Sequence, residues 1–172
     1  MNIMIVGVGG QGTLLASRIL GKAAIKEGYD VKVSEVHGMS QRGGSVVTYV
    51  KYGDKVYSPI IDRGEADLIL AFEMLEAMRA LPYLKKGGKM IANTQKMNPM
   101  PVITGAMEYP ENIEEKLSAK INLQAVDALS LAEKAGTIKA VNVVLIGLLA
   151  KSMDGDRKST RLNSSHITIS YA

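Results

Sequence analysis

The sequence opens with Asn2-Ile-Met-Ile-Val6, an apolar run followed at once by Gly7-Val-Gly9-Gly10-Gln11-Gly12. From Thr13 to Glu27 the apolar residues recur with helical spacing, and Gly28 ends that pattern. A buried strand, a glycine-rich turn and an amphipathic helix form the usual first unit of a parallel α/β sheet. We name Gly7–Gly12 the glycine turn.

The alternation of strand and helix patterns continues along the chain. Gly53-Asp54 is a turn signal, so we predict a hairpin at this point, with Pro59 on an edge strand. The predicted strands span 31–36, 45–52, 55–61, 66–72, 89–93 and 121–126, and the predicted helices span 73–84, 111–120, 128–135 and 140–153. The order predicts an α/β fold, a Rossmann-like three-layer sandwich with a mostly parallel sheet.

Composition narrows the chemistry of the chain. Apolar residues make up 47% of the 172 residues, yet there is one Phe and no Trp, so we expect an aliphatic core. The chain has no Cys, so we expect no metal site and no iron–sulfur cluster held by thiolates in this chain. No signal peptide or membrane-spanning run is visible, and we expect a cytoplasmic protein with no membrane partner.

The positive net charge comes from the end of the chain. The 21 basic residues include Arg157, Lys158 and Arg161, whereas none of the 17 acidic residues lies beyond Asp156. We therefore expect no nucleic-acid partner. Residues 157–172 are rich in Ser and Thr and lack the patterning of the body. We interpret 1–156 as one domain, truncated at its C-terminus, and 157–172 as a disordered tail that is a translation artefact; a genuine flexible tail is the alternative.

The glycine turn has two interpretations. Gly7-Val-Gly9-Gly10-Gln11-Gly12 contains the G-x-G-x-x-G spacing that brings a phosphate to a helix N-terminus. Glu35, on the second strand, is the acid that would bind a ribose in a dinucleotide site. The other interpretation is a turn that packs the first helix tightly or receives a loop of a partner. The pattern alone leaves both open.

A polar, glycine-rich loop follows the second strand, and ligands of α/β sheets bind at such strand ends. His37 is the candidate catalytic residue because it exchanges protons near neutral pH, with a packed or supporting role as the alternative. Arg42 can bind a carboxylate or phosphate, or form an ion pair in an interface. The candidate residues for ligand or partner-loop binding here are Ser40, Gln41, Arg42, Gly43 and Gly44.

Two further polar residues interrupt apolar elements. Glu73 comes at a strand end and a predicted helix start, where a carboxylate is favoured by the helix dipole. We prefer that interpretation to a catalytic one. Asn142 lies in an apolar helical run, and we expect its amide to bond to a backbone group.

Three segments together resemble one family. Gly-Val-Gly-Gly-Gln-Gly at 7–12, Ser-Glu-Val-His-Gly-Met-Ser-Gln-Arg-Gly-Gly-Ser-Val at 34–46 and Glu-Ala-Asp-Leu-Ile-Leu-Ala-Phe-Glu at 65–73 resemble the gamma-type domain of 2-oxoacid:ferredoxin oxidoreductases. The second segment is similar to the version found in the beta subunits of indolepyruvate enzymes. The resemblance covers residues 1 to about 155, and the final segment expected of the family is absent.

The resemblance implies that the reaction needs two kinds of subunit with different roles. A large alpha subunit would hold thiamine diphosphate and iron–sulfur clusters, coenzyme A would be the co-substrate, and ferredoxin would accept the electrons. This chain would hold no cofactor, and its glycine turn and 37–44 loop would face the alpha subunit and border the coenzyme A or substrate entrance. The rival hypotheses are a stand-alone NAD-dependent oxidoreductase and a non-catalytic assembly subunit.

Overall fold

The computed structural model describes residues 1–37 and 43–154. Within them, six strands form one sheet in the order β2-β3-β1-β4-β5-β6. Strands β1, β4, β5 and β6 pair in parallel, whereas β3 runs antiparallel between β2 and β1. The strands are β1 Asn2–Val8, β2 Asp30–His37, β3 Ser45–Gly53, β4 Ala66–Ala71, β5 Leu84–Asn93 and β6 Asn122–Val126.

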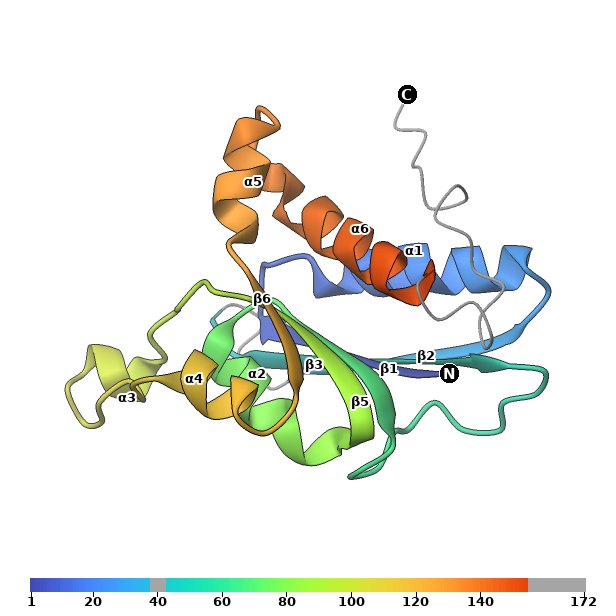
Figure 1. Cartoon of the computed structure of the whole chain (residues 1–172), viewed down its shortest axis with the longest axis horizontal. Helices are drawn as coiled ribbons and strands as arrows, with labels where there is room; N and C mark the ends of the chain where they lie inside the picture. The colour runs from blue at the N-terminus through green and yellow to red at the C-terminus, as the bar shows by residue number, and fades with distance from the viewer. Residues whose placement is uncertain (38–42, 155–172) are drawn as a thin grey trace.

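Helices cover both faces of this sheet, which confirms the predicted three-layer α/β sandwich (Figure 1). One layer contains α1 (Thr13–Lys26), α5 (Ala128–Lys134) and α6 (Val141–Asp154), with the 3₁₀ turn η2 (Ile138–Ala140) before α6. The other layer contains α2 (Met74–Ala80), the turn η1 (Leu81–Tyr83) and α4 (Ile113–Ser118). A short helix, α3 (Met100–Ile103), lies on a segment that projects from the body (Figure 1).

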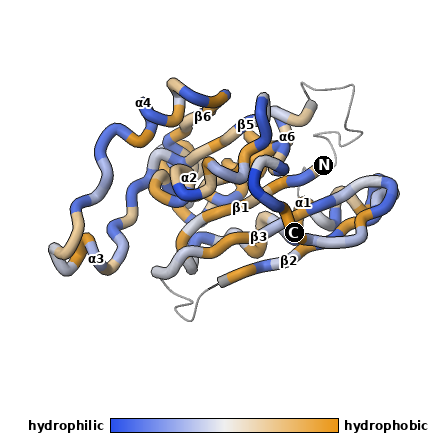
Figure 2. The backbone as a smooth tube through the Cα atoms, turned by 90° about the horizontal axis from the view of Figure 1, so that it is seen from below, coloured by the Kyte–Doolittle hydropathy of each residue, from blue (hydrophilic) through white to orange (hydrophobic). Residues whose placement is uncertain are grey.

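Each face of the sheet has its own aliphatic core. Along β1, Ile3 and Ile5 pack with α1 and α6, whereas Met4 and Val6 pack with α2 and α4. Successive side chains of a strand point to opposite faces, so a strand covered on both sides must be apolar throughout. This explains the buried apolar runs Ile3–Val6 of β1, Leu68–Ala71 of β4 and Met90–Ala92 of β5. The middle of β1 is coloured as hydrophobic in Figure 2.

The predicted strand at 55–61 is wrong. Strand β3 pairs with β2 on one side and β1 on the other, so neither of its edges is free to form the expected hairpin. The backbone of the segment bonds to side chains instead: the N–H of Val56 donates to Asp30, and Nζ of Lys51 donates to the carbonyl oxygen of Ile60. Ile61 is buried and anchors the segment against the second core.

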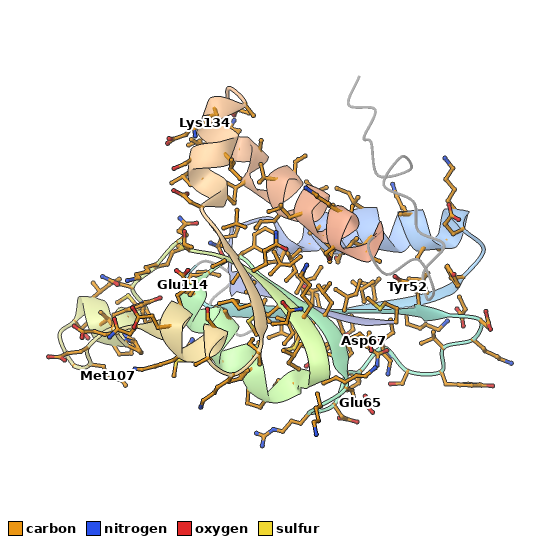
Figure 3. All side chains as sticks on the ribbon, in the orientation of Figure 1. Tyr52, Glu65, Asp67, Met107, Glu114 and Lys134 are labelled. Atoms are coloured by element: carbon orange, nitrogen blue, oxygen red, sulfur yellow. The ribbon has the colours of Figure 1, made fainter. Side chains whose placement is uncertain are left out.

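Two other boundaries differ from the prediction. The helix after β4 ends at Ala80, because Pro82 lies in the 3₁₀ turn that follows, and β5 begins at Leu84 rather than at residue 89. Residues 97–110, which belong to none of the predicted strands or helices, contain α3 and carry exposed apolar side chains. Met107 lies at the outer end of this projection (Figure 3).

Candidate functional site

The glycine turn connects the carboxyl end of β1 to the N-terminus of α1. Gly12 immediately precedes the helix, and its φ of 86° lies in the left-handed region that favours glycine. At Gly7 a Cβ atom would lie 2.8 Å from Oε1 of Gln11 and 3.0 Å from Cβ of Phe72. Both glycines are therefore needed for the close packing of the turn, with or without a ligand.

Gln11 holds the turn in shape. Its Oε1 accepts from the N–H of Val8 at 2.7 Å, and its Nε2 donates to the carbonyl oxygen of Phe72 at 3.2 Å. The same nitrogen lies 3.4 Å from Oε1 of Gln95. Phe72 follows β4 and Gln95 follows β5, so this one side chain joins the carboxyl ends of three parallel strands.

The end of the 37–44 loop lies against the glycine turn. The N–H of Gly9 donates to the carbonyl oxygen of Gly44 at 2.9 Å, and Gly43 has a φ of 75°. His37 ends β2, where it pairs with Val46 of β3. The side chain of His37 and all of Ser40, Gln41 and Arg42 lie outside the described residues.

A cavity of about 400 Å³ opens beside the turn and reaches Glu35. Its lining also includes Gly9, Gly12 and Val46, and Oε2 of Glu35 lies 3.5 Å from the hydroxyl of Thr48. In a dinucleotide site the acid lies on the strand next to β1. Here β3 separates β1 from β2, which moves Glu35 two strand spacings, about 9.5 Å, from β1. The spacing in the sequence singled out Glu35 as the acid of a dinucleotide site. It did not predict that β3 lies between β2 and β1.

A second cavity, of about 380 Å³, lies on the other side of the glycine turn. Its polar lining comes from Gln11, Gln95, Lys139 and Asn142. Asn142 was expected to bond to a backbone group, and its Oδ1 accepts from the N–H of Val143 at 2.9 Å. Its Nδ2 lies 3.0 Å from the place of a Cβ on Gly12, so a larger residue there would move this amide.

Glu73 is the N-terminal cap of α2, which confirms the preferred interpretation. Its Oε2 accepts from the N–H of Glu76 at 2.9 Å, and its side chain is 1% exposed. Oε1 accepts from the hydroxyl of Tyr109 at 2.6 Å and from the N–H of Met97 at 3.0 Å. Burial, and then the bond to Glu73, raise the pKa of Tyr109 above its ordinary value.

Several contacts at this edge were not foreseen, notably those of Ser45, Gln95 and Tyr109. Gln95 follows the carboxyl end of β5 by two residues, which is where polar side chains of an α/β sheet meet. That signal was present in Asn93-Thr94-Gln95. Ser45 and Tyr109 gave no comparable signal, because their importance depends on an acid far away in the sequence.

Across 1–37 and 43–154, no group of three or more His, Cys, Asp or Glu side chains could hold a metal ion. No helix in that part of the chain is both long enough and apolar enough to cross a membrane.

Comparison with known proteins identifies the family. The model of the pyruvate ferredoxin/flavodoxin oxidoreductase family matches residues 2–163. The chain belongs to this family. Its members named below are subunits of oxoacid oxidoreductases, so the resemblance carried by the three sequence segments is confirmed.

Individual relatives refine the assignment. The chain is 49% identical over 155 residues to the indolepyruvate oxidoreductase subunit IorB of Pyrococcus horikoshii, covering 88% of this chain and 77% of that protein. It is 30% identical over 149 residues to the common gamma subunit of the pyruvate/ketoisovalerate oxidoreductases of Thermococcus kodakarensis, covering 85% and 74%. The crystal structure of pyruvate oxidoreductase subunit PORC from Thermotoga maritima has the same fold, with a TM-score of 0.67, 20% identity and coverage of 90% and 76%.

Proposed function

We propose that this chain is the small subunit of an enzyme complex that oxidatively decarboxylates aryl 2-oxoacids such as indolepyruvate to acyl-coenzyme A, with ferredoxin as electron acceptor. The observation that carries the proposal is the 49% identity to an indolepyruvate oxidoreductase subunit, against 30% to a subunit shared by pyruvate enzymes. Membership of the pyruvate ferredoxin/flavodoxin oxidoreductase family supports ferredoxin as the acceptor. A cytoplasmic location fits a reaction that uses coenzyme A and a reduced carrier.

The redox cofactors of this proposal belong to a partner. Iron–sulfur clusters are held by cysteine thiolates, and the 172 residues contain no Cys, so this chain does not fit a cluster. We assign the clusters and thiamine diphosphate to a large alpha subunit. Bound there, they supply decarboxylation and electron transfer. The residues of this chain bind, orient and exclude water at the border of that site.

The carboxyl edge of the sheet is the surface that we assign to the alpha subunit. The glycine turn and Gly43–Gly44 lie there, in contact through Gly9. Large apolar side chains surround them: Leu14 and Leu15 in the first turn of α1, Val36 at the end of β2 and Ile138 in η2 are between 37% and 61% exposed. Exposed apolar groups around a polar, glycine-lined centre are typical of a protein interface. The entrance for coenzyme A or the oxoacid would lie along this border.

Reconstitution tests the function. The chain, produced together with its large subunit, should reduce ferredoxin in the presence of indolepyruvate and coenzyme A, and should prefer indolepyruvate to pyruvate. The large subunit alone should not turn over. Full turnover by the large subunit alone would show that this chain is an assembly subunit. Replacing Arg42 with Ala should lower acyl-coenzyme A formation, and unchanged kinetics with unchanged assembly would remove the loop from the mechanism.

The cavity between the glycine turn and Glu35 adds a structural feature to the sequence pattern that favours stand-alone NAD binding. Two contacts argue against it: β3 separates Glu35 from β1, and the N–H of Gly9 is used by Gly44 rather than being free for a phosphate. Titration of the isolated chain with NAD decides the matter. We expect no saturable binding, and binding that Glu35→Ala abolishes would support the rival.

A further inference from the structure

Two acids in the first turn of α2 are buried although the helix needs only one of them as a cap. Glu73 is 1% exposed and Glu76 is 4% exposed. A carboxylate removed from water costs free energy that its contacts must offset. A Ser or Thr at the cap position would satisfy the helix at a lower cost. The contacts that these two carboxylates make outside α2 therefore call for a physical reason.

Glu76 departs from the usual pairing at a helix start. In a capping box, the acid three residues after the cap turns back to the backbone N–H of the cap residue. Glu76 instead accepts from the hydroxyl of Ser45 at 2.5 Å through Oε2, and from Nη1 of Arg79 at 2.6 Å through Oε1. Ser45 begins β3 and directly follows Gly44, whose carbonyl oxygen accepts from Gly9. A chain of contacts thus connects Glu76 to the glycine turn.

Glu73 makes the corresponding connection on the other side. While Oε2 caps the helix, Oε1 accepts from the N–H of Met97 and the hydroxyl of Tyr109, the two ends of the projecting segment. Gln95, two residues before Met97, lies against Gln11 of the glycine turn and accepts from the N–H of Met74 through its backbone carbonyl. One carboxylate therefore holds both ends of 97–109, and this segment follows Gln95, the residue that contacts the turn.

We propose that Glu73 and Glu76 are positioning residues: at the N-terminus of α2 they hold two segments, 43–45 beside the glycine turn and 97–109 directly after Gln95, in their working geometry. The proposal rests on the function proposed for the glycine turn. Neither acid touches substrate. They act through Ser45, Met97 and Tyr109. A misplacement of about 1 Å at a reacting site can lower activity strongly, even when the change is made far from the chemistry.

The two carboxylate oxygens of Glu76 have different partners, which allows a test with a matched control. Ser45→Ala and Glu76→Ala each remove the contact toward the glycine turn, whereas Arg79→Ala removes only the contact on the far side. Hydrogen exchange on the isolated chain should show the amide of Gly9 exchanging roughly tenfold faster in the first two variants and unchanged in Arg79→Ala. Glu76→Gln keeps an oxygen that accepts from Ser45, so it should restore slow exchange.

Kinetics of the reconstituted complex provide the second readout. Ser45→Ala and Glu76→Ala should raise the KM for coenzyme A or the oxoacid by roughly three- to tenfold, and the double variant should be no worse than either single variant. Tyr109→Phe should act similarly through the other segment. Arg79→Ala should lower the melting temperature and leave KM unchanged.

The outcomes separate this proposal from the one on which it rests. If the variants lower the melting temperature but leave Gly9 exchange and KM at wild-type values, both acids are structural and the positioning role is overturned. If that result comes with a raised KM in Gly12→Ala, the proposed function stands without it. If Gly9 exchange responds as expected but neither Gly12→Ala nor the Ser45 and Glu76 variants alter KM, the glycine turn does not border the reaction, and both proposals fail.

Discussion

The backbone N–H of Gly9 donates to the carbonyl oxygen of Gly44 at 2.9 Å. This bond joins the turn after β1 to the residue just before β3, although the two lie on separate motifs of the sequence. It exists because β1 ends and β3 begins at the same edge of the sheet. The glycine turn and Gly43–Gly44, the described end of the second motif, thus lie side by side at this edge of the sheet.

Gly136 is a matched control for a substitution of Gly12 in the glycine turn. Both have positive φ, 86° and 97°, but only Gly12 faces a neighbour, Nδ2 of Asn142. Alanine at either position should lower the free energy of unfolding by about 1–2 kcal/mol, the cost of left-handed backbone for a residue with Cβ. The similar cost is expected because the amide of Asn142 can move aside. Urea denaturation measures both values. A much larger loss in Gly12→Ala would mean that Asn142 is held rigidly.

Tyr52 and Tyr109 should respond to Phe substitution in opposite ways. Within the described residues the buried hydroxyl of Tyr52, which lies between the sheet and α1 (Figure 3), has no hydrogen-bond partner. Tyr52→Phe should therefore be neutral or stabilise the protein by up to about 1 kcal/mol. Tyr109→Phe takes a donor from buried Glu73 and should cost about 1–3 kcal/mol. Thermal unfolding compares them, and equal effects would contradict the assigned contacts.

Alkaline pH should destabilise the fold through the same two tyrosines. Burial raises the pKa of Tyr52 and of Tyr109, with Tyr29 adding to the first and Glu73 to the second. Below the ordinary pKa of about 10, folded and unfolded chains both keep these protons. Above it the unfolded chain ionises first, so the free energy of unfolding should fall as pH rises past about 10. Urea titrations at about pH 8 and pH 11 test this. The double Phe variant should show a shallower fall.

Leu15 and Ile25 test which part of α1 faces the alpha subunit. Both are exposed, 37% and 62%, but Leu15 is in the first turn beside the glycine turn and Ile25 is in the last turn. Leu15→Glu should weaken binding of the large subunit at least roughly tenfold, because a charge would be buried in the interface. Ile25→Glu should bind normally. Surface plasmon resonance with the purified subunit measures both. The opposite ranking would move the interface away from the carboxyl edge.

The periodic elements of the fold could be predicted from the sequence, because burial on both faces forces apolar runs such as Ile3–Val6 in β1 and Leu68–Ala71 in β4. The strand order could not. Gly53-Asp54 carries a turn signal, yet the antiparallel partners of β3 are β1 and β2, which both precede it in the chain. A local turn signal says nothing about which edges of a strand are already paired. Because both edges of β3 are paired, residues 55–61 form no strand beside it.

Some residues of the candidate site could likewise be predicted from the sequence, and others could not. The glycines and Gln11 could be found from their spacing, because a tight turn imposes local requirements. Glu73 could be recognised as a cap, but its second oxygen binds residues more than 20 positions away. Contacts of that kind depend on tertiary structure, so the roles of Tyr109 and Ser45 could not be predicted from the sequence.

The antiparallel course of β3 has a consequence for how this scaffold can change. Every residue of β2, from Asp30 to His37, is paired with β3, so the register of the two strands is set without help from the loop that joins them. An exchange of the joining residues should therefore leave this register unchanged. A family that must accept different oxoacids could diversify at this connection, and a transplant of these few residues between paralogues would be the natural route to altered selectivity.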